Sequence, residues 1–175
     1  TYGDGDWFEA SNWSMGVPTG SHFAQISRGT ATISYGGAVA DSLHVHDFPR
    51  FGVSGAVVIT ETGSLSTNTV YIPKYATEQG AFSQTGGQNT VNGVLYLAPA
   101  ADTGGVYDLS GTGAVSAQAL LVGGHGTGTF THSGGTNTVL GDLTLGSQET
   151  GVGTYDLAGT GELSVQGRLI VGESG

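Results

Sequence analysis

The sequence repeats itself at an offset of 48 residues, and this period constrains the fold more than any other feature of the chain. Residues 80–127 align with residues 128–175 without a gap. Equivalent positions carry the same residues: Phe82 and Phe130, Asn89 and Asn137, Leu95 and Leu143, and Tyr107-Asp108-Leu109 and Tyr155-Asp156-Leu157. Each block divides into two related coils of about 24 residues, one led by phenylalanine and one by tyrosine. Repeats of this length are typical of solenoids, in which each unit buries its apolar face against the next.

Apolar residues form columns when the coils are aligned. The first column contains Val57, Phe82, Tyr107, Phe130 and Tyr155. The second contains Leu65, Val91, Val115, Val139 and Leu163. The third is a pair of columns two residues apart: Leu43, Val70, Leu95, Leu120, Leu143 and Leu169 beside Val45, Ile72, Leu97, Val122, Leu145 and Val171. An apolar period of two indicates half-buried strands.

Helices do not fit this pattern, because glycine interrupts every segment. The sequence therefore predicts an all-β, single-domain parallel β-helix (β-solenoid) with about 24 residues and three short strands per coil. Paired glycines such as Gly86-Gly87 are expected at sharp corners. The asparagines that follow, Asn89 and Asn137, are expected to stack as an amide ladder or to adopt left-handed backbone. We expect a right-handed coil, since these coils are long for the left-handed hexapeptide type.

The chain divides into a capping segment, residues 1–36, and a solenoid of about six coils, residues 37–175. Residues 1–36 do not match the repeat and contain both tryptophans. We expect Trp7, Phe8 and Trp13 to pack over the first coil, because a solenoid needs an atypical unit to cover its end.

The C-terminal sequence stops in mid-pattern, without a comparable cap. The run Leu169-Ile170-Val171-Gly172 matches residues 120–123, which continue directly into another coil. An uncovered parallel edge is a template for further pairing. These four residues are therefore the predicted assembly edge. We expect this edge to stack on copies of the chain as a homopolymer, to contact other surface components, or to continue in a longer protein.

The charge of the chain excludes several kinds of partner. The net charge is −10, and the four cationic residues are scattered: Arg28, Arg50, Lys74 and Arg168. A phosphate backbone requires clustered lysine and arginine, so nucleic acid is excluded. No apolar run approaches the roughly 18 residues that span a bilayer, so we expect no membrane insertion by this segment. Acidity, few lysines and abundant Gly, Ser and Thr favour an exported protein.

Paired carboxylates are the first candidates for chemistry, because glycosidases need two of them facing each other across a cleft. Asp108 and Asp156 recur at one repeat position, between an inward tyrosine and an inward leucine. They should therefore form a solvated outer stripe. Basic residues that would bind an acidic sugar are sparse. We expect no catalytic residues and no enzyme.

Metal ligands are equally sparse, and no cofactor is expected. Asp4 and Asp6 form a short acidic Asp-Gly-Asp run that is a weak candidate for calcium, with a plain turn as the alternative. His44 and His46 lie on one face of a strand, and we interpret them as exposed histidines rather than as a metal site. His125 and His132 occupy non-equivalent repeat positions, and we interpret them as incidental.

Three stretches of sequence carry a family resemblance. They are the opening WFEASNWSMGVP, the ALLVG-type strand at 119–123, and the alternating GTFTHSGGTNTV and GTYDLAGTGELSV segments. They resemble the Gly-rich repeats of secreted bacterial surface proteins, of the autotransporter-passenger-like and PEP-CTERM-type exported kinds. The resemblance covers nearly the whole chain and implies a parallel β-helix outside a Gram-negative-type cell.

The resemblance carries no catalytic residue set. It implies a non-catalytic extracellular structural module: a segment of a surface fibre, sheath, stalk or adhesin that assembles or continues end to end. The alternative is a carbohydrate-binding or polysaccharide-degrading β-helix.

Overall fold

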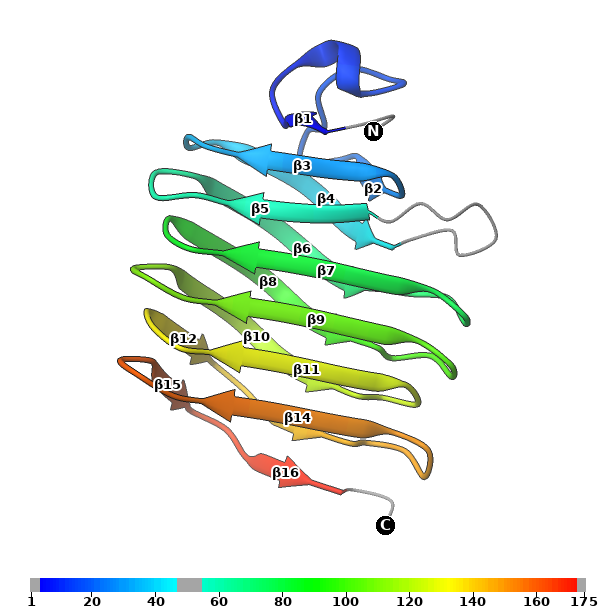
Figure 1. Ribbon diagram of the computed structural model, residues 1–175, viewed down its shortest axis with the longest axis vertical. Helices are drawn as coiled ribbons and strands as arrows, with labels where there is room; N and C mark the ends of the chain where they lie inside the picture. The colour runs from blue at the N-terminus through cyan, green and yellow to red at the C-terminus, as the bar shows by residue number, and fades with distance from the viewer. Residues whose placement is uncertain (1–3, 47–54, 173–175) are drawn as a thin grey trace.

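The computed structural model describes residues 4–46 and 55–172. The chain winds through about six coils, spaced about 25 residues apart, and the strands pair in parallel. In Figure 1 the near strands run right to left and the far strands return left to right while the chain descends, which is a right-handed winding. The predicted parallel β-helix is confirmed.

Two sheets face each other across the core. The first takes one strand from each coil: β1 (Gly5–Asp6), β3 (Gly29–Ile33), β5 (Gly55–Ile59), β7 (Gln79–Gln84), β9 (Gly104–Leu109), β11 (Thr127–His132) and β14 (Val152–Leu157). The second contains β2 (Phe23–Ile26), β4 (Ala38–Val45), β6 (Ser64–Ile72), β8 (Gln88–Leu97), β10 (Ala114–Val122), β12 (Thr136–Val139), β13 (Leu143–Leu145), β15 (Glu162–Val165) and β16 (Leu169–Val171). A short 3-10 turn, η1 (Ala10–Asn12), lies in the cap.

The second and third strands expected in each coil are separate only in the last two coils, as β12 with β13 and β15 with β16. In the four coils before these, one long strand spans both positions: β4, β6, β8 and β10. The pairing of β6 with β8 shifts register between Thr67 and Val70. Two outward residues, Asn68 and Thr69, follow one another at this shift. The strand therefore bends there, and both of its halves turn apolar side chains inward.

The first and third predicted columns match the observed register, for example Phe82 opposite Tyr107 and Leu120 opposite Leu143. The second column was wrong by two residues in alternate coils. Its members are Leu65, Asn89, Val115, Asn137 and Leu163. Val91 and Val139 lie in the next inward column, which also holds Thr67, Ala117 and Val165.

The aromatic side chains of the first column stack directly on one another. Ring centroids lie 4.7 Å apart between Phe82 and Tyr107, 4.7 Å between Tyr107 and Phe130, and 4.8 Å between Phe130 and Tyr155. The interplanar angles are 7°, 3° and 5°. This distance is the spacing of hydrogen-bonded strands, so the sheet sets the separation of the rings.

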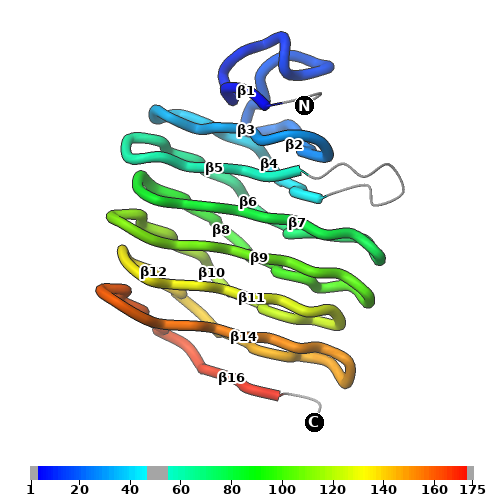
Figure 2. The backbone as a smooth tube through the Cα atoms, in the orientation of Figure 1, coloured from blue at the N-terminus to red at the C-terminus, as the bar shows by residue number. Residues whose placement is uncertain are grey.

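The cap folds over one end of the stack, as Figure 2 shows, and β16 lies at the other end. Trp7 is 1% exposed and belongs to the hydrophobic core. The indole of Trp13 meets it edge-on at 4.8 Å and donates a hydrogen bond of 2.7 Å to its carbonyl oxygen. Phe8 stacks on Tyr35 at 4.1 Å. Because β2 and β3 already pair with coil strands, regular winding begins near residue 23.

Glycine is required where the corners of adjacent coils touch. Gly87 has a φ of +62°, and a Cβ there would meet the carbonyl oxygen of Gly63 in the coil above. We predict that Gly87→Ala lowers the free energy of unfolding by about 2 kcal/mol or more, from left-handed backbone strain and this contact. Urea denaturation measures the effect. Gly20→Ala is the matched control, because a Cβ there meets nothing within 4 Å. Equal stability of the two variants would contradict the prediction.

Candidate functional site

The inward side chains of the last described coil form an exposed apolar face. Leu157 is 51% exposed, Leu169 60% and Val171 70%. Leu143, which pairs with Leu169 from the coil above, is only 1% exposed. The strands β14, β15 and β16 end the two sheets in the described part of the chain. We call this surface, formed by β14, β15 and β16, the terminal face.

The predicted assembly edge lies on this terminal face. Leu169 and Val171 belong to the inward columns, opposite Leu143 and Leu145. Ile170, between them, points to the other side of the sheet and is half-buried. The N–H of Gly172 donates to the carbonyl oxygen of Leu145 at 2.9 Å, which keeps the end of the strand in register.

A buried polar network lies inside the stack, behind the aromatic column. The hydroxyl of Tyr107 donates to Oε1 of Gln84 at 2.6 Å and accepts from Nδ2 of Asn89 at 3.0 Å. One repeat later, the hydroxyl of Tyr155 lies 2.9 Å from Nδ1 of His132 and accepts from Nδ2 of Asn137 at 2.9 Å. The same arrangement therefore occurs twice, at the 48-residue offset.

This network gives the two kinds of coil distinct chemistry. A Phe-type coil carries phenylalanine, a glutamine or histidine, and an asparagine, as in Phe130, His132 and Asn137. A Tyr-type coil carries tyrosine and two aliphatic residues at the same positions, as in Tyr155, Leu157 and Leu163. Each tyrosine hydroxyl reaches back to the polar side chains of the preceding Phe-type coil. The 48-residue unit is thus a hydrogen-bonded pair of unlike coils.

Two interpretations from the sequence are corrected here. Asn89 and Asn137 neither stack on each other nor adopt left-handed backbone; they lie in strands, each 1% exposed, and bind tyrosine hydroxyls. His132 is not incidental, because it is fully buried in the position of Gln84 and contacts Tyr155 and the carbonyl oxygen of Gly135. The offset of 48 does align Gln84 with His132, and this alignment was the available clue.

Burial keeps both tyrosines protonated. It raises the pKa of Tyr107 well above its usual range and that of Tyr155 to about 12, although the hydrogen bonds from Asn89 and Asn137 oppose these shifts. A neutral phenol can donate and accept at once, which is what the Tyr107 hydroxyl does. Both hydroxyls therefore stay neutral across the physiological pH range.

A row of hydrogen-bonded polar side chains lies outside the core, at the bend of the second sheet. Nδ2 of Asn68 donates to Oδ1 of Asp41 at 2.8 Å, and Nδ2 of Asn92 lies 3.5 Å from Oδ1 of Asn68. These contacts link three successive coils on the outer surface. These hydrogen bonds hold neighbouring coils together, and they involve only an aspartate and two asparagines.

The two histidines of the first coils are buried, so the expectation of exposed histidines was wrong. His44 is 3% exposed and lies edge-on to Phe23 at 4.2 Å and to Tyr71 at 4.8 Å. His46 is 2% exposed; its Nδ1 lies 3.1 Å from Oε1 of Glu78. Neighbouring coils cover both rings, and they sit in separate environments rather than sharing a ligand.

The acidic candidates hold backbone groups. Asp4 Oδ1 accepts from the N–H of Thr30 at 2.7 Å, and Asp6 Oδ1 accepts from the N–H of Phe8 at 2.8 Å. Both contacts fasten the cap. Within residues 4–46 and 55–172, no group of three or more His, Cys, Asp or Glu side chains is placed to hold a metal ion. Asp108 and Asp156 are exposed on the outer face of the first sheet, two coils apart with Thr131 between them.

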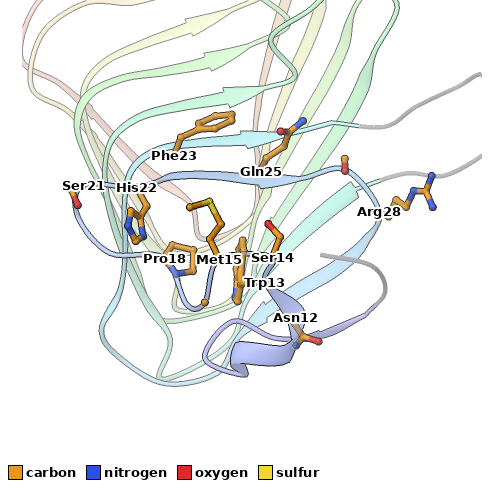
Figure 3. A pocket seen from close by; sticks show the side chains of 12 residues that line it. Asn12, Trp13, Ser14, Met15, Pro18, Ser21, His22, Phe23, Gln25 and Arg28 are labelled. Carbon is orange, nitrogen blue, oxygen red and sulfur yellow. The ribbon is translucent and has the colours of Figure 1, made fainter.

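A groove of about 700 Å³ lies between the cap and β2. Figure 3 shows Trp13, Met15 and Pro18 of the cap on one side and Phe23 and Gln25 of β2 on the other. Phe23 is 52% exposed and Met15 87%. The lining contains no carboxyl group, so the groove has the shape of a binding site without the acid pair that hydrolysis of a glycoside needs.

No protein-family model, curated protein or solved structure matches the chain. In the described ranges, no helix has the length and apolar character required to cross a bilayer. Function is therefore inferred from the geometry of the chain itself.

We predict that Tyr107→Phe destabilises the fold by about 1–3 kcal/mol, because it leaves Oε1 of Gln84 and Nδ2 of Asn89 without a partner in the core. Tyr155→Phe is the matched control and should cost less, since Tyr155 itself is only half-buried. Thermal or urea unfolding measures both. If the Tyr107→Phe variant unfolds with the same free energy as the wild type, the network contributes nothing to stability.

His44 gives a pH dependence of known sign. Burial, with smaller contributions from the charges of Lys74 and His46, lowers the pKa of His44 to about 4, against 6.5 when unfolded. The unfolded chain therefore binds more protons below pH 6.5. Stability should fall by on the order of 1–3 kcal/mol as the pH drops from 6.5 to 4. His44→Phe should remove this part of the slope in urea titrations at several pH values; identical slopes would contradict the prediction.

Proposed function

We propose that this chain is a non-catalytic structural module of an extracellular or cell-surface assembly, extended at its terminal face by another β layer. The observation that carries the proposal is the abrupt change in exposure at that face, from 1% at Leu143 to 60% at Leu169. The edge strands of a sheet readily pair with further strands. An apolar face bounded by such strands favours contact with a β layer.

The architecture supports a mechanical role. Apolar side chains line the core along the stack, and aromatic rings stack through the coils from Phe82 to Tyr155. Parallel ladders hold each coil to its neighbours. Fibres, sheaths, stalks and adhesins of the Gram-negative type that the sequence resembles need such stiff, hydrated elements.

Extension is proposed at one end only. At the other end, the side chain of Trp7 closes the core, and the backbone N–H of Trp7 donates to the carbonyl oxygen of Thr32 at 2.8 Å. A head-to-tail homopolymer would require this cap to open. Under this proposal, a further coil packs on the terminal face, or a second copy of the chain binds to it through its own terminal face.

Carbohydrate binding is the second candidate, favoured by the groove between the cap and β2. The groove has the volume typical of a small-molecule site. Exposed Phe23 offers an aromatic surface beside the polar Gln25. A glycan array together with a reducing-sugar assay separates the two candidates, because saccharide turnover or tight glycan binding would displace the structural proposal.

We predict that the purified chain associates in pairs as its concentration rises, because the cap blocks the other end. Sedimentation velocity measures the association. The double variant Leu169→Lys/Val171→Lys should remain monomeric, since each lysine would be desolvated at the joined faces. Leu140→Lys is the control: Leu140 is 44% exposed away from the terminal face, so its replacement should leave association unchanged. A wild-type chain that stays monomeric at millimolar concentration would refute end association.

A further inference from the structure

The terminal face belongs to a Tyr-type coil, and the same kind of face occurs once more inside the stack. There Tyr107, Leu109 and Val115 form the lower surface of a Tyr-type coil. One repeat later, Tyr155, Leu157 and Leu163 form the terminal face. The internal copy is covered, so the chain itself shows which residues fit on this surface.

A Phe-type coil covers the internal copy. Phe130 lies on the ring of Tyr107 at 4.7 Å, His132 pairs with Leu109, and Asn137 pairs with Val115. The polar groups of His132 and Asn137 reach the hydroxyl of Tyr155 in the following coil, not the coil above. The Phe-type coil therefore takes no side-chain hydrogen bond from the Tyr-type face above it, and its phenylalanine brings no hydroxyl to the aromatic position.

A Tyr-type coil would fit the same face poorly. In both observed cases, the tyrosine hydroxyl reaches back to a glutamine or histidine and to an asparagine of the coil above. On the terminal face, Leu157 and Leu163 occupy those two positions. A tyrosine placed there would bury its hydroxyl against aliphatic groups with no partner. A buried hydroxyl without a hydrogen bond is strongly disfavoured.

We propose that the terminal face selectively binds a β layer of the Phe-type pattern, with phenylalanine rather than tyrosine over Tyr155. This inference rests on the proposed function, because it names the partner of the same face. A second copy of the chain offers a Tyr-type terminal face or a closed cap, so neither of its ends is the preferred partner.

The test uses two peptides that differ by one hydroxyl group. The first has the sequence of residues 127–147, a Phe-type coil, and the second is the same peptide with Phe130→Tyr. Each is labelled at its N-terminus, and the whole chain is titrated in while fluorescence anisotropy is recorded. We expect the tyrosine peptide to bind roughly tenfold or more weakly, from the unpaired hydroxyl. Leu169→Lys/Val171→Lys in the chain should abolish binding of both peptides.

A reciprocal variant tests the cause. Leu157→His/Leu163→Asn gives the terminal face the polar side chains of a Phe-type coil. Leu157 is largely exposed and Leu163 partly so, so the fold should be retained, which circular dichroism checks. With partners now available for the hydroxyl, the preference should invert and the tyrosine peptide should bind more tightly.

The outcomes separate this inference from the proposed function. Equal binding of both peptides overturns the selectivity and leaves the structural role standing. Failure of both peptides to bind a chain that still associates in pairs overturns only the inference. Failure of both peptides together with a strictly monomeric chain overturns the inference and the proposed function. A preference that does not respond to Leu157→His/Leu163→Asn overturns the hydroxyl argument.

Discussion

The structure depends on the stacking of like residues, in register, at the spacing of hydrogen-bonded parallel strands. A single coil encloses too little apolar surface to be stable alone, so its inward side chains are buried by equivalents above and below. The Phe130 ring is held between Tyr107 at 4.7 Å and Tyr155 at 4.8 Å. Because the backbone ladder fixes these distances, a change of shape in one coil disturbs two others.

The buried hydroxyls explain why the repeat is 48 residues and not 24. In a purely aliphatic core, any coil could follow any other, because leucine and valine pack on either neighbour. The hydroxyl of Tyr107 removes this freedom, since it needs the amides of Gln84 and Asn89 in the coil above. A buried polar network favours the one arrangement that satisfies it and disfavours the others. The pair of unlike coils is the smallest unit that satisfies the tyrosine hydroxyl.

The sequence predicts the fold well where every coil supplies an apolar residue, as in the aromatic column and the two columns that end at Leu169 and Val171. It fails where alternate coils place asparagine inward. Matching Val91 to Leu65 keeps the apolar pattern but shifts the register by two residues. Because a shift of two residues leaves the same side chains facing inward, the alternation of apolar residues does not reveal the error. The burial of His44 was equally hidden, because the rings beside it come from Phe23 and Tyr71 in other coils.

The candidate site was only partly predictable for the same reason. The apolar alternation at the end of the repeat locates the edge residues Leu169 and Val171 from sequence alone. The kind of layer that fits there depends on where the Tyr155 hydroxyl points and on which side chains lie beside it. The direction of the hydroxyl depends on how the side chains pack, and it cannot be predicted from the periodicity of the sequence.

The two ends of the stack differ, and in the proposed assembly this difference gives extension a direction. At the first coil, a two-residue strand pairs with β3 and then delivers Trp7 over the core, so the apolar columns are closed by a single large side chain. At the terminal face, the described residues instead present leucine and valine at the positions where a solvent-facing edge would carry charge or proline. Aliphatic side chains on a flat, strand-bounded surface are a liability unless another layer covers them. In the proposed assembly, layers therefore add away from the cap, and the coil type at the terminal face governs which layer comes next.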